Sequence, residues 1–283
     1  RFFTSQKMLG PKIQDGTLRK NLVEPPWHCP DEYLNLPIHM RQFEMELLTP
    51  KAADNGEVVL QLHGGGYIAK IRNAYRDFAV RYSKIDQYRV LSVDYRVAPQ
   101  HPYPAAFQDA IEAYRWLLYS GFSGDRIILA GDSAGGGLVL ALAMYLRDQS
   151  MPLPKKLVMM SPWTDLTASG PSYQENYEND PLFGNTRESM IYNGEYAGKQ
   201  DPKLPYISPL FGDFHGLPPM LFQVGSLEML LSDSVLAAQK AKEAGCDVTL
   251  TVYQDMFHVF QLSMDKLAES RAAWDEVAAF LGK

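Results

Sequence analysis

Apolar runs of strand length alternate with longer helical stretches from about residue 57 to the end of the chain. We expect strands at 58–62, 89–93, 126–130, 156–161, 220–224 and 248–253. We expect helices at 104–120, 136–148, 232–244 and 268–281. This alternation is typical of an α/β fold, in which helices cover both faces of a mostly parallel sheet. A chain of 283 residues can form one such domain, so we expect a single domain over 1–283.

Two segments break the alternation. Residues 1 to about 40 mix prolines, aromatic residues and charges, and residues from about 164 to 206 are rich in Tyr, Asn, Pro and Gly. Ligands of parallel α/β folds bind at the carboxyl ends of the strands. We therefore expect both segments to form a helical cap over that end of the sheet. The alternative is a frayed N-terminus and a long surface loop.

Charge and composition exclude several classes of partner. The formal net charge is −6 and no basic run is present, which argues against a nucleic-acid partner. Apolar stretches such as 138–145 fall far short of the roughly 20 residues that span a bilayer, so we expect no membrane span. Cys29 and Cys246 lack the spacing of a metal or redox site, which favours a reducing, cytoplasmic location.

The expected strand 126–130 leads directly into the sequence GDSAG at 131–135, which an apolar helix follows. A Gly-x-Ser-x-Gly turn between a strand and a helix is typical of a nucleophile elbow, so Ser133 is the candidate nucleophile. The alternative is a glycine-rich turn with a helix-capping serine, and the strand and helix around it make that less favourable. A phosphate-binding loop is disfavoured because the turn lacks both the Gly-Lys-Ser/Thr ending and the GxGxxG spacing.

A second glycine-rich turn, HGGGY at 63–67, follows the expected strand 58–62. Consecutive glycines let a backbone approach a substrate closely and present N–H groups to a developing oxyanion. With the N–H of Ala134, this loop is the candidate oxyanion hole. We expect His63 to hold the loop through hydrogen bonds rather than to transfer protons. The alternative is a connector with no catalytic task.

The general base should follow the nucleophile in the chain, because the order in this architecture is Ser, acid, His. His215 and His258 are the histidines after Ser133. His215 precedes the expected strand 220–224, whereas His258 follows the expected strand 248–253 by a short loop. His258 is therefore the candidate base, at the same edge of the sheet as Ser133.

The acid should follow the strand at 220–224, and the loop after it contains Glu228 and Asp233. Asp233 comes where the next helix begins, and a helix N-terminus stabilises a negative charge there without any catalytic role. We therefore prefer Glu228, with Asp233 as the alternative. The acid would hold the tautomer of His258 and stabilise its imidazolium.

Taken together, these motifs resemble the hormone-sensitive-lipase family of α/β-hydrolases, in the branch of bacterial carboxylesterases and acetyl esterases. The matching stretches are HGGG at 63–66, DYRVAP at 94–99, HPYP at 101–104, GDSAGG at 131–136, SPWTD at 161–165, SPL at 208–210 and LPP at 217–219. They cover most of the chain from about residue 56 onward.

The resemblance implies site residues and a substrate class. By likeness to the family, Gly65 and Gly66 join Ala134 as oxyanion donors, the N-terminal segment forms part of the cap, and no cofactor is needed. The family more often has Asp, usually followed by Pro, where this chain has Glu228. It also commonly has Gly after the base, where this chain has Val259.

We therefore expect a serine carboxylesterase that hydrolyses short-chain carboxylic esters through an acyl-enzyme, with a small neutral ester as its partner. Activity should fall as pH drops through the pKa of the imidazole, about 6.5 when unperturbed. An amidase or peptidase on the same fold is one alternative. A ligand-binding receptor, as in the plant gibberellin receptors, is another, and the presence of His258 argues against it. An exposed edge strand at 248–253 would permit a homodimer.

Overall fold

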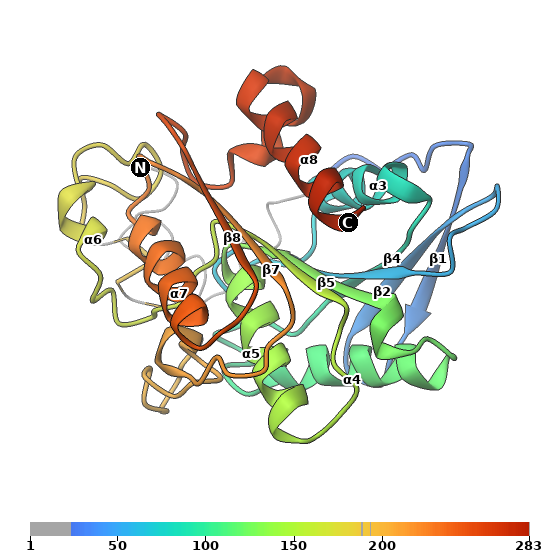
Figure 1. The fold of residues 1–283 in the computed structure, drawn as a ribbon, viewed down its shortest axis with the longest axis horizontal. Helices are drawn as coiled ribbons and strands as arrows, with labels where there is room; N and C mark the ends of the chain where they lie inside the picture. The colour runs from blue at the N-terminus through green and yellow to red at the C-terminus, as the bar shows by residue number, and fades with distance from the viewer. Residues whose placement is uncertain (1–23, 188, 193, 283) are drawn as a thin grey trace.

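An eight-stranded sheet forms the centre of the computed structural model, which describes residues 24–187, 189–192 and 194–282 (Figure 1). The strand order is β1-β2-β4-β3-β5-β6-β7-β8. The strands are β1 (Tyr33–His39), β2 (Glu44–Pro50), β3 (Val58–Leu62), β4 (Arg89–Asp94), β5 (Ile127–Asp132), β6 (Lys156–Met160), β7 (Met220–Gly225) and β8 (Val248–Tyr253). The helices of four residues or more in the α conformation are α3 (Asn73–Asp86), α4 (Ala105–Tyr119), α5 (Ala134–Asp148), α6 (Ser172–Glu175), α7 (Leu231–Glu243) and α8 (Ala268–Leu281).

Strands β3 to β8 are parallel to one another. At one edge of the sheet, β2 pairs antiparallel with both β1 and β4. Every residue of β3, β5 and β6 is buried, because helices cover both faces of the sheet. The predicted mostly parallel α/β fold is therefore confirmed. The expected strands and helices from residue 58 onward agree with the structure to within two residues at each end.

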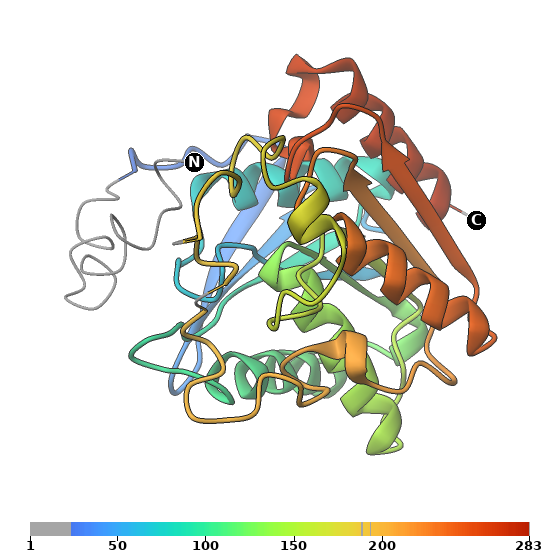
Figure 2. The same cartoon turned by 90° about the vertical axis from the view of Figure 1, so that its left-hand side faces the viewer.

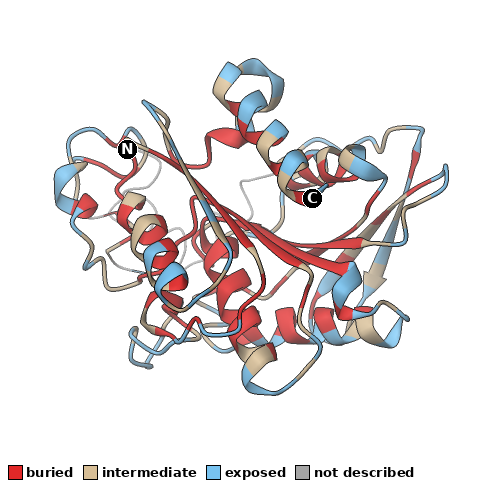
Figure 3. Ribbon diagram, in the orientation of Figure 1, coloured by how far each residue is buried: buried red, intermediate tan, exposed pale blue. Residues whose placement is uncertain are grey.

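Helices α3 and α8 lie on one face of the sheet, and α4, α5 and α7 lie on the other (Figures 1 and 2). Trp274 of α8 packs edge-on against Phe78 and Tyr82 of α3, with ring centroids 5.0 Å apart in both pairs. On the opposite face α5 is buried along nearly its whole length (Figure 3). Full burial of one such apolar side chain stabilises the fold by about 1.5–3 kcal/mol. Among the described residues, the helices are all too short or too polar to cross a membrane.

Among the strands and the α-helices longer than four residues, β1, β2 and α3 were not expected from the sequence. The two strands form an edge hairpin whose residues are mostly half-buried or exposed, so their apolar pattern is weak. This hairpin corrects the expected cap, because residues 33–39 belong to the sheet. Residues 24–27 lie along α3, where Glu24 accepts a 2.8 Å hydrogen bond from the backbone N–H of Asn73. Residues 1–23 of the expected N-terminal cap segment lie outside the described residues.

Candidate active site

The chain makes a sharp turn between β5 and α5, and Ser133 lies at this turn with φ 51° and ψ −123°. A side chain on Gly135 would collide with the carbonyl oxygen of Leu62 at the end of β3. Only glycine permits this close approach of helix and strand. The strand–turn–helix context expected for the elbow is present, and Ser133 is 8% exposed.

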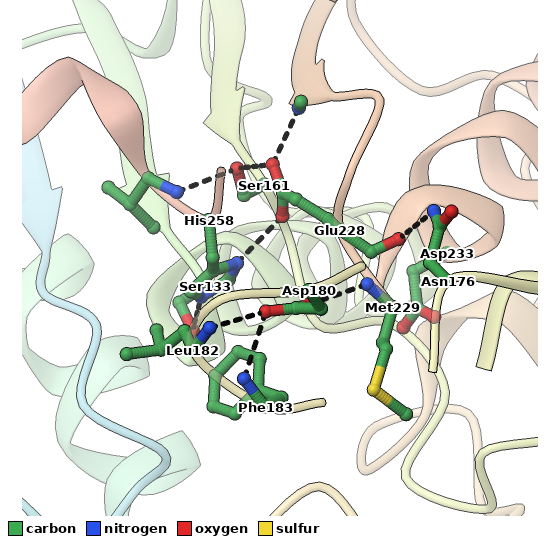
Figure 4. A network of polar contacts seen from close by, with 12 residues as sticks. Ser133, Ser161, Asn176, Asp180, Leu182, Phe183, Glu228, Met229, Asp233 and His258 are labelled. Atoms are coloured by element: carbon green, nitrogen blue, oxygen red, sulfur yellow. Dashed lines mark hydrogen bonds and ion pairs between the residues drawn. The ribbon is translucent and has the colours of Figure 1, made fainter. Parts of the chain in front are cut away.

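Ser133, His258 and Glu228 form one chain of hydrogen bonds (Figure 4). Nε2 of His258 lies 2.9 Å from Oγ of Ser133, and Nδ1 lies 2.7 Å from Oε2 of Glu228. The three residues follow β5, β8 and β7, whose carboxyl ends meet at one edge of the parallel sheet. The structure thus brings together the three side chains that the sequence singles out, although they are far apart along the chain.

Glu228 is fully buried and both of its oxygens are bonded. While Oε2 faces His258, Oε1 accepts hydrogen bonds from the Ser161 hydroxyl at 2.7 Å and from the Gly225 backbone N–H at 2.5 Å. The Ser161 hydroxyl oxygen in turn accepts a 3.1 Å hydrogen bond from the backbone N–H of Val259, next to His258. Sequence reasoning missed Ser161, which shares the SPWTD stretch but shows no catalytic pattern of its own.

The pKa of the His258 imidazole is raised above its usual value. Burial is the largest influence and opposes the charged form. The hydrogen bond and negative charge of Glu228, with the charges of Asp180 and Asp132, outweigh it. The site therefore favours the imidazolium that would form when His258 takes a proton from Ser133.

The alternative acid, Asp233, does not reach His258. Its Oδ2 accepts hydrogen bonds from the backbone N–H groups of Thr164 at 2.7 Å and Asp165 at 2.8 Å. Burial, followed by the charge of Asp165, raises the pKa of Asp233 to about 8. Asp233 therefore fixes the chain after β6, and Glu228 is the carboxylate that is bonded to His258.

The other two histidines named above, His63 and His215, make contacts that differ from those of His258. His63 is buried, its Nδ1 lies 2.7 Å from the carbonyl oxygen of Gly64, and its ring stacks on Tyr95 at 4.1 Å. Burial lowers the pKa of His63 to about 4, so the ring is neutral and braces the glycine loop. His215 is exposed and its Nδ1 lies 2.8 Å from Oδ1 of Asp213. Its carbonyl oxygen accepts a hydrogen bond from Arg147 at the C-terminal end of α5, whereas Ser133 precedes the N-terminal end of that helix.

The glycine loop after β3 borders the same site. Gly65 and Gly66 have φ values of 114° and 62°, and both line a cavity with Ser133. Ala134 follows Ser133 and opens α5, where the first backbone N–H groups of a helix have no partner within it. Gly65 and Gly66 therefore border the same cavity as Ser133, and Ala134 is the next residue after Ser133 in the chain.

Asp132, one residue before the candidate nucleophile, fastens this loop to the elbow. Its Oδ1 accepts a 2.9 Å hydrogen bond from the Gly64 N–H, and its Oδ2 accepts a 3.1 Å hydrogen bond from the hydroxyl of Tyr75. Burial raises the pKa of Asp132 to about 6. Sequence reasoning missed this role, although the residue lies inside the GDSAG motif.

A cavity of about 450 Å³ opens beside Ser133 and His258. Its lining is mainly apolar and includes Ile68, Trp163, Leu182, Phe183, Met190 and Leu230. Three of these residues come from the segment 164–206 after β6, the yellow-to-orange chain in Figure 2. Arg72 also reaches the cavity, but its charge pairs with Glu24 at 3.2 Å. Such a pocket suits an uncharged acyl or alcohol group.

Comparisons with known proteins identify a family and relatives of this chain. A family profile described as "alpha/beta hydrolase fold" matches residues 59–262. The chain is 39% identical to an acetyl-hydrolase of Streptomyces hygroscopicus over 81% of this chain and 77% of that protein. It is 35% identical to an esterase of Acinetobacter venetianus over 79% of this chain and 74% of that protein.

Solved structures show the same likeness. An esterase from the bacterial hormone-sensitive lipase family superposes with a TM-score of 0.84 at 36% identity, covering 96% of this chain and 97% of that one. An esterase/lipase from an uncultured bacterium gives a TM-score of 0.81 at 35% identity, with 96% and 97% covered. The chain belongs to the hormone-sensitive-lipase family of α/β-hydrolases, within its branch of bacterial esterases.

Proposed function

We propose that this protein is a serine carboxylesterase that hydrolyses short-chain carboxylic esters through an acyl-enzyme. The observation that carries the proposal is the hydrogen-bonded chain from Ser133 through His258 to Glu228, which borders an apolar cavity. In this proposal residues 1–283 form one domain, and the segment 164–206 is its cap. Small uncharged esters are its partners and no cofactor takes part.

The geometry supports a two-step reaction. His258 Nε2 takes the proton of Ser133 as Oγ attacks the ester carbonyl, and the N–H groups of Gly65, Gly66 and Ala134 bind the resulting oxyanion. The imidazolium then gives its proton to the leaving alcohol, and the acyl group stays on Oγ. Water, activated by the same imidazole, repeats the sequence and releases the carboxylic acid. Glu228 keeps Nδ1 protonated throughout.

The preference for short acyl chains is supported by the cavity and by a relative. Trp163 and Phe183 close part of a space of about 450 Å³, which must hold both sides of the ester. The relative from Streptomyces hygroscopicus bears the name acetyl-hydrolase. We expect turnover of nitrophenyl esters to peak at short acyl chains.

The test is a nitrophenyl ester series of increasing acyl length, run with the wild type and with Ser133→Ala. We expect the variant to lose turnover by a factor of about 10⁶, because removal of a triad nucleophile has that effect. An organophosphate should attach to Ser133 and block the wild type. Full turnover by Ser133→Ala would end the proposal.

Two other functions appear as outcomes of the same experiment. Faster cleavage of an anilide than of the ester with the same acyl group would indicate an amidase or peptidase. Absence of both turnover and organophosphate labelling would indicate a ligand-binding receptor. The bonded triad disfavours the receptor, because a binding protein has no need of an aligned base.

We also propose that the protein forms a homodimer in which β8 of one copy pairs with β8 of the other. We further propose that it is located in the cytoplasm and does not bind nucleic acid. Strand β8 is at the edge of the sheet and Val252 is 42% exposed, which leaves backbone groups available to a second copy. Cys29 and Cys246 are free thiols, in keeping with a reducing compartment, and the net charge of −6 repels phosphate backbones. Sedimentation at several concentrations would measure the oligomeric state.

A further inference from the structure

Three polar side chains of the cap bind the backbone of the loop that carries Glu228. Two of them, Asn176 and Asp180, are drawn in Figure 4. Ser172 Oγ donates to the carbonyl oxygen of Met229 at 2.7 Å, and Asn176 Nδ2 donates to that of Glu228 at 2.7 Å. Oδ2 of Asp180 accepts a 2.8 Å hydrogen bond from the backbone N–H of Met229. The three residues are spaced four apart in the sequence, so one continuous stretch of the cap lies against the loop of Glu228.

Asp180 differs from the other two because it also shapes the cavity. Its Oδ1 accepts hydrogen bonds from the backbone N–H groups of Leu182 at 2.7 Å and Phe183 at 2.9 Å. Both of these residues line the cavity. The ring of Phe183 meets the ring of His258 edge-on, with centroids 4.9 Å apart. One fully buried carboxylate therefore joins the cavity lining to the loop of the acid.

We propose that Asp180 is a positioning residue for the reaction. It fixes Phe183 and Glu228 relative to each other, so that His258 is held between an aromatic ring on one side and its carboxylate partner on the other. The inference rests on the proposed function, since it assigns Asp180 a part in keeping the base aligned with Ser133. In this role Asp180 acts through Phe183 and the loop of Glu228.

The charge of Asp180 gives its role a separate readout. The carboxylates that act on His258 are Glu228 from the loop after β7, Asp180 from the cap and Asp132 from the end of β5. Each raises the pKa of the imidazole. Removing the charge of Asp180 should therefore lower that pKa, and the acidic limb of the kcat/KM profile should move to lower pH. A residue that only stabilised the fold would not move this limb.

The test uses Asp180→Asn in the whole 283-residue chain. An amide at this position keeps an acceptor for Leu182 and Phe183 but turns an N–H₂ group toward the N–H of Met229. We expect kcat for a short nitrophenyl ester to fall about tenfold, as for loss of one charge-assisted hydrogen bond, together with the shift of the acidic limb. Asp201→Asn is the matched control. Its carboxylate accepts a 2.9 Å bond from the N–H of Lys203, the same two-residue turn, but it is exposed.

The proposal is overturned if Asp180→Asn keeps both the kcat and the acidic limb of the wild type, or if its melting temperature falls while the limb stays in place. Should Asp180→Asn not fold, Asp180→Glu keeps the charge but misplaces it. We then expect a reduced kcat with an unshifted limb, and an undiminished kcat would overturn the proposal. Ser133→Ala separates the two claims, because it loses turnover if the proposed function holds, whatever Asp180 does.

Discussion

The hydroxyl of Ser161 donates a 2.7 Å hydrogen bond to Oε1 of Glu228, the oxygen that faces away from His258. Ser161 follows β6 and has a positive φ of 48°, which turns the residue toward the acid loop. The same hydroxyl accepts a bond from the N–H of Val259. Ser161 thus connects the loop of the acid with the loop of the base.

Replacing Ser161 with Ala should reduce kcat about tenfold, because Glu228 loses a donor and Val259 loses its acceptor. Steady-state kinetics on a short nitrophenyl ester measure the effect. Ser123→Ala provides the control, because the exposed Ser123 hydroxyl bonds only to its neighbour Asp125 among the contacts that the structure describes. Equal kcat values for the two variants would contradict the bracing role of Ser161.

Exchanging each carboxylate of the β7–α7 region for its amide distinguishes the two candidate acids. Glu228→Gln should lower kcat by about 10⁴, since an amide next to Nδ1 favours the wrong tautomer of His258. Asp233→Asn should keep kcat within about threefold, because the pKa of Asp233, raised to about 8, already keeps that group neutral at pH 7. If kinetic assays showed a larger loss of kcat for Asp233→Asn than for Glu228→Gln, Asp233 would be the supporting acid instead.

The pH profile should show an acidic limb above the usual value for histidine. The pKa of His258 is raised, so its neutral form, which must accept the proton, is lost at a higher pH than about 6.5. Activity should therefore fall as pH decreases through a midpoint above about 6.5. A kcat/KM profile from pH 4 to pH 9 tests this, and a midpoint below about 6 would show that burial outweighs Glu228.

Adding a methyl group at Gly66 should impair the oxyanion site. Gly66 has a φ of 62°, and a Cβ there would lie 2.8 Å from Sδ of Met190. Gly66→Ala should reduce kcat by about 10²–10³, the effect of losing one oxyanion donor.

Gly245→Ala is the control for backbone strain. Gly245 has a φ of 82°, and nothing lies within 4 Å of the added carbon. An alanine there would therefore have the same kind of backbone strain as one at Gly66, but without the close contact to another side chain. We expect it to lose about 1 kcal/mol of stability and no kcat. Similar kcat values for the Gly66 and Gly245 variants would argue against Gly66 as an oxyanion donor. Thermal unfolding monitors the stability of both.

The parts of the fold that could be predicted are those that leave a local pattern. Buried parallel strands such as β5 read as unbroken apolar runs, and their carboxyl ends lie together whatever the intervening loops do. For this reason Ser133, Glu228 and His258 could be placed at one edge without coordinates. Residue types and their order relative to the strands are sufficient for this prediction, whereas the distances between the side chains come from the structure.

The parts that could not be predicted depend on contacts between distant segments. Ser161 and Asp180 are ordinary loop residues in the sequence, and the 67-residue and 49-residue separations to their partners leave no local trace. Strand β1 falls within the expected cap because Pro37 interrupts its short apolar alternation, and in the structure Leu34 and Leu36 are exposed rather than buried. Its place is decided by pairing with β2, a tertiary interaction.

His258 follows β8, which has one neighbour among the described strands of the chain, whereas Ser133 follows β5 in the middle of the sheet. Local opening of a protein begins where backbone hydrogen bonds are most exposed to water. In a chain that is not paired with a second copy, detachment of β8 would therefore withdraw the imidazole of His258 while the turn that carries Ser133 stayed intact. On heating, esterase turnover should therefore be lost at a lower temperature than the global fold, and the loss of turnover would report local unfolding at the β8 edge of the sheet.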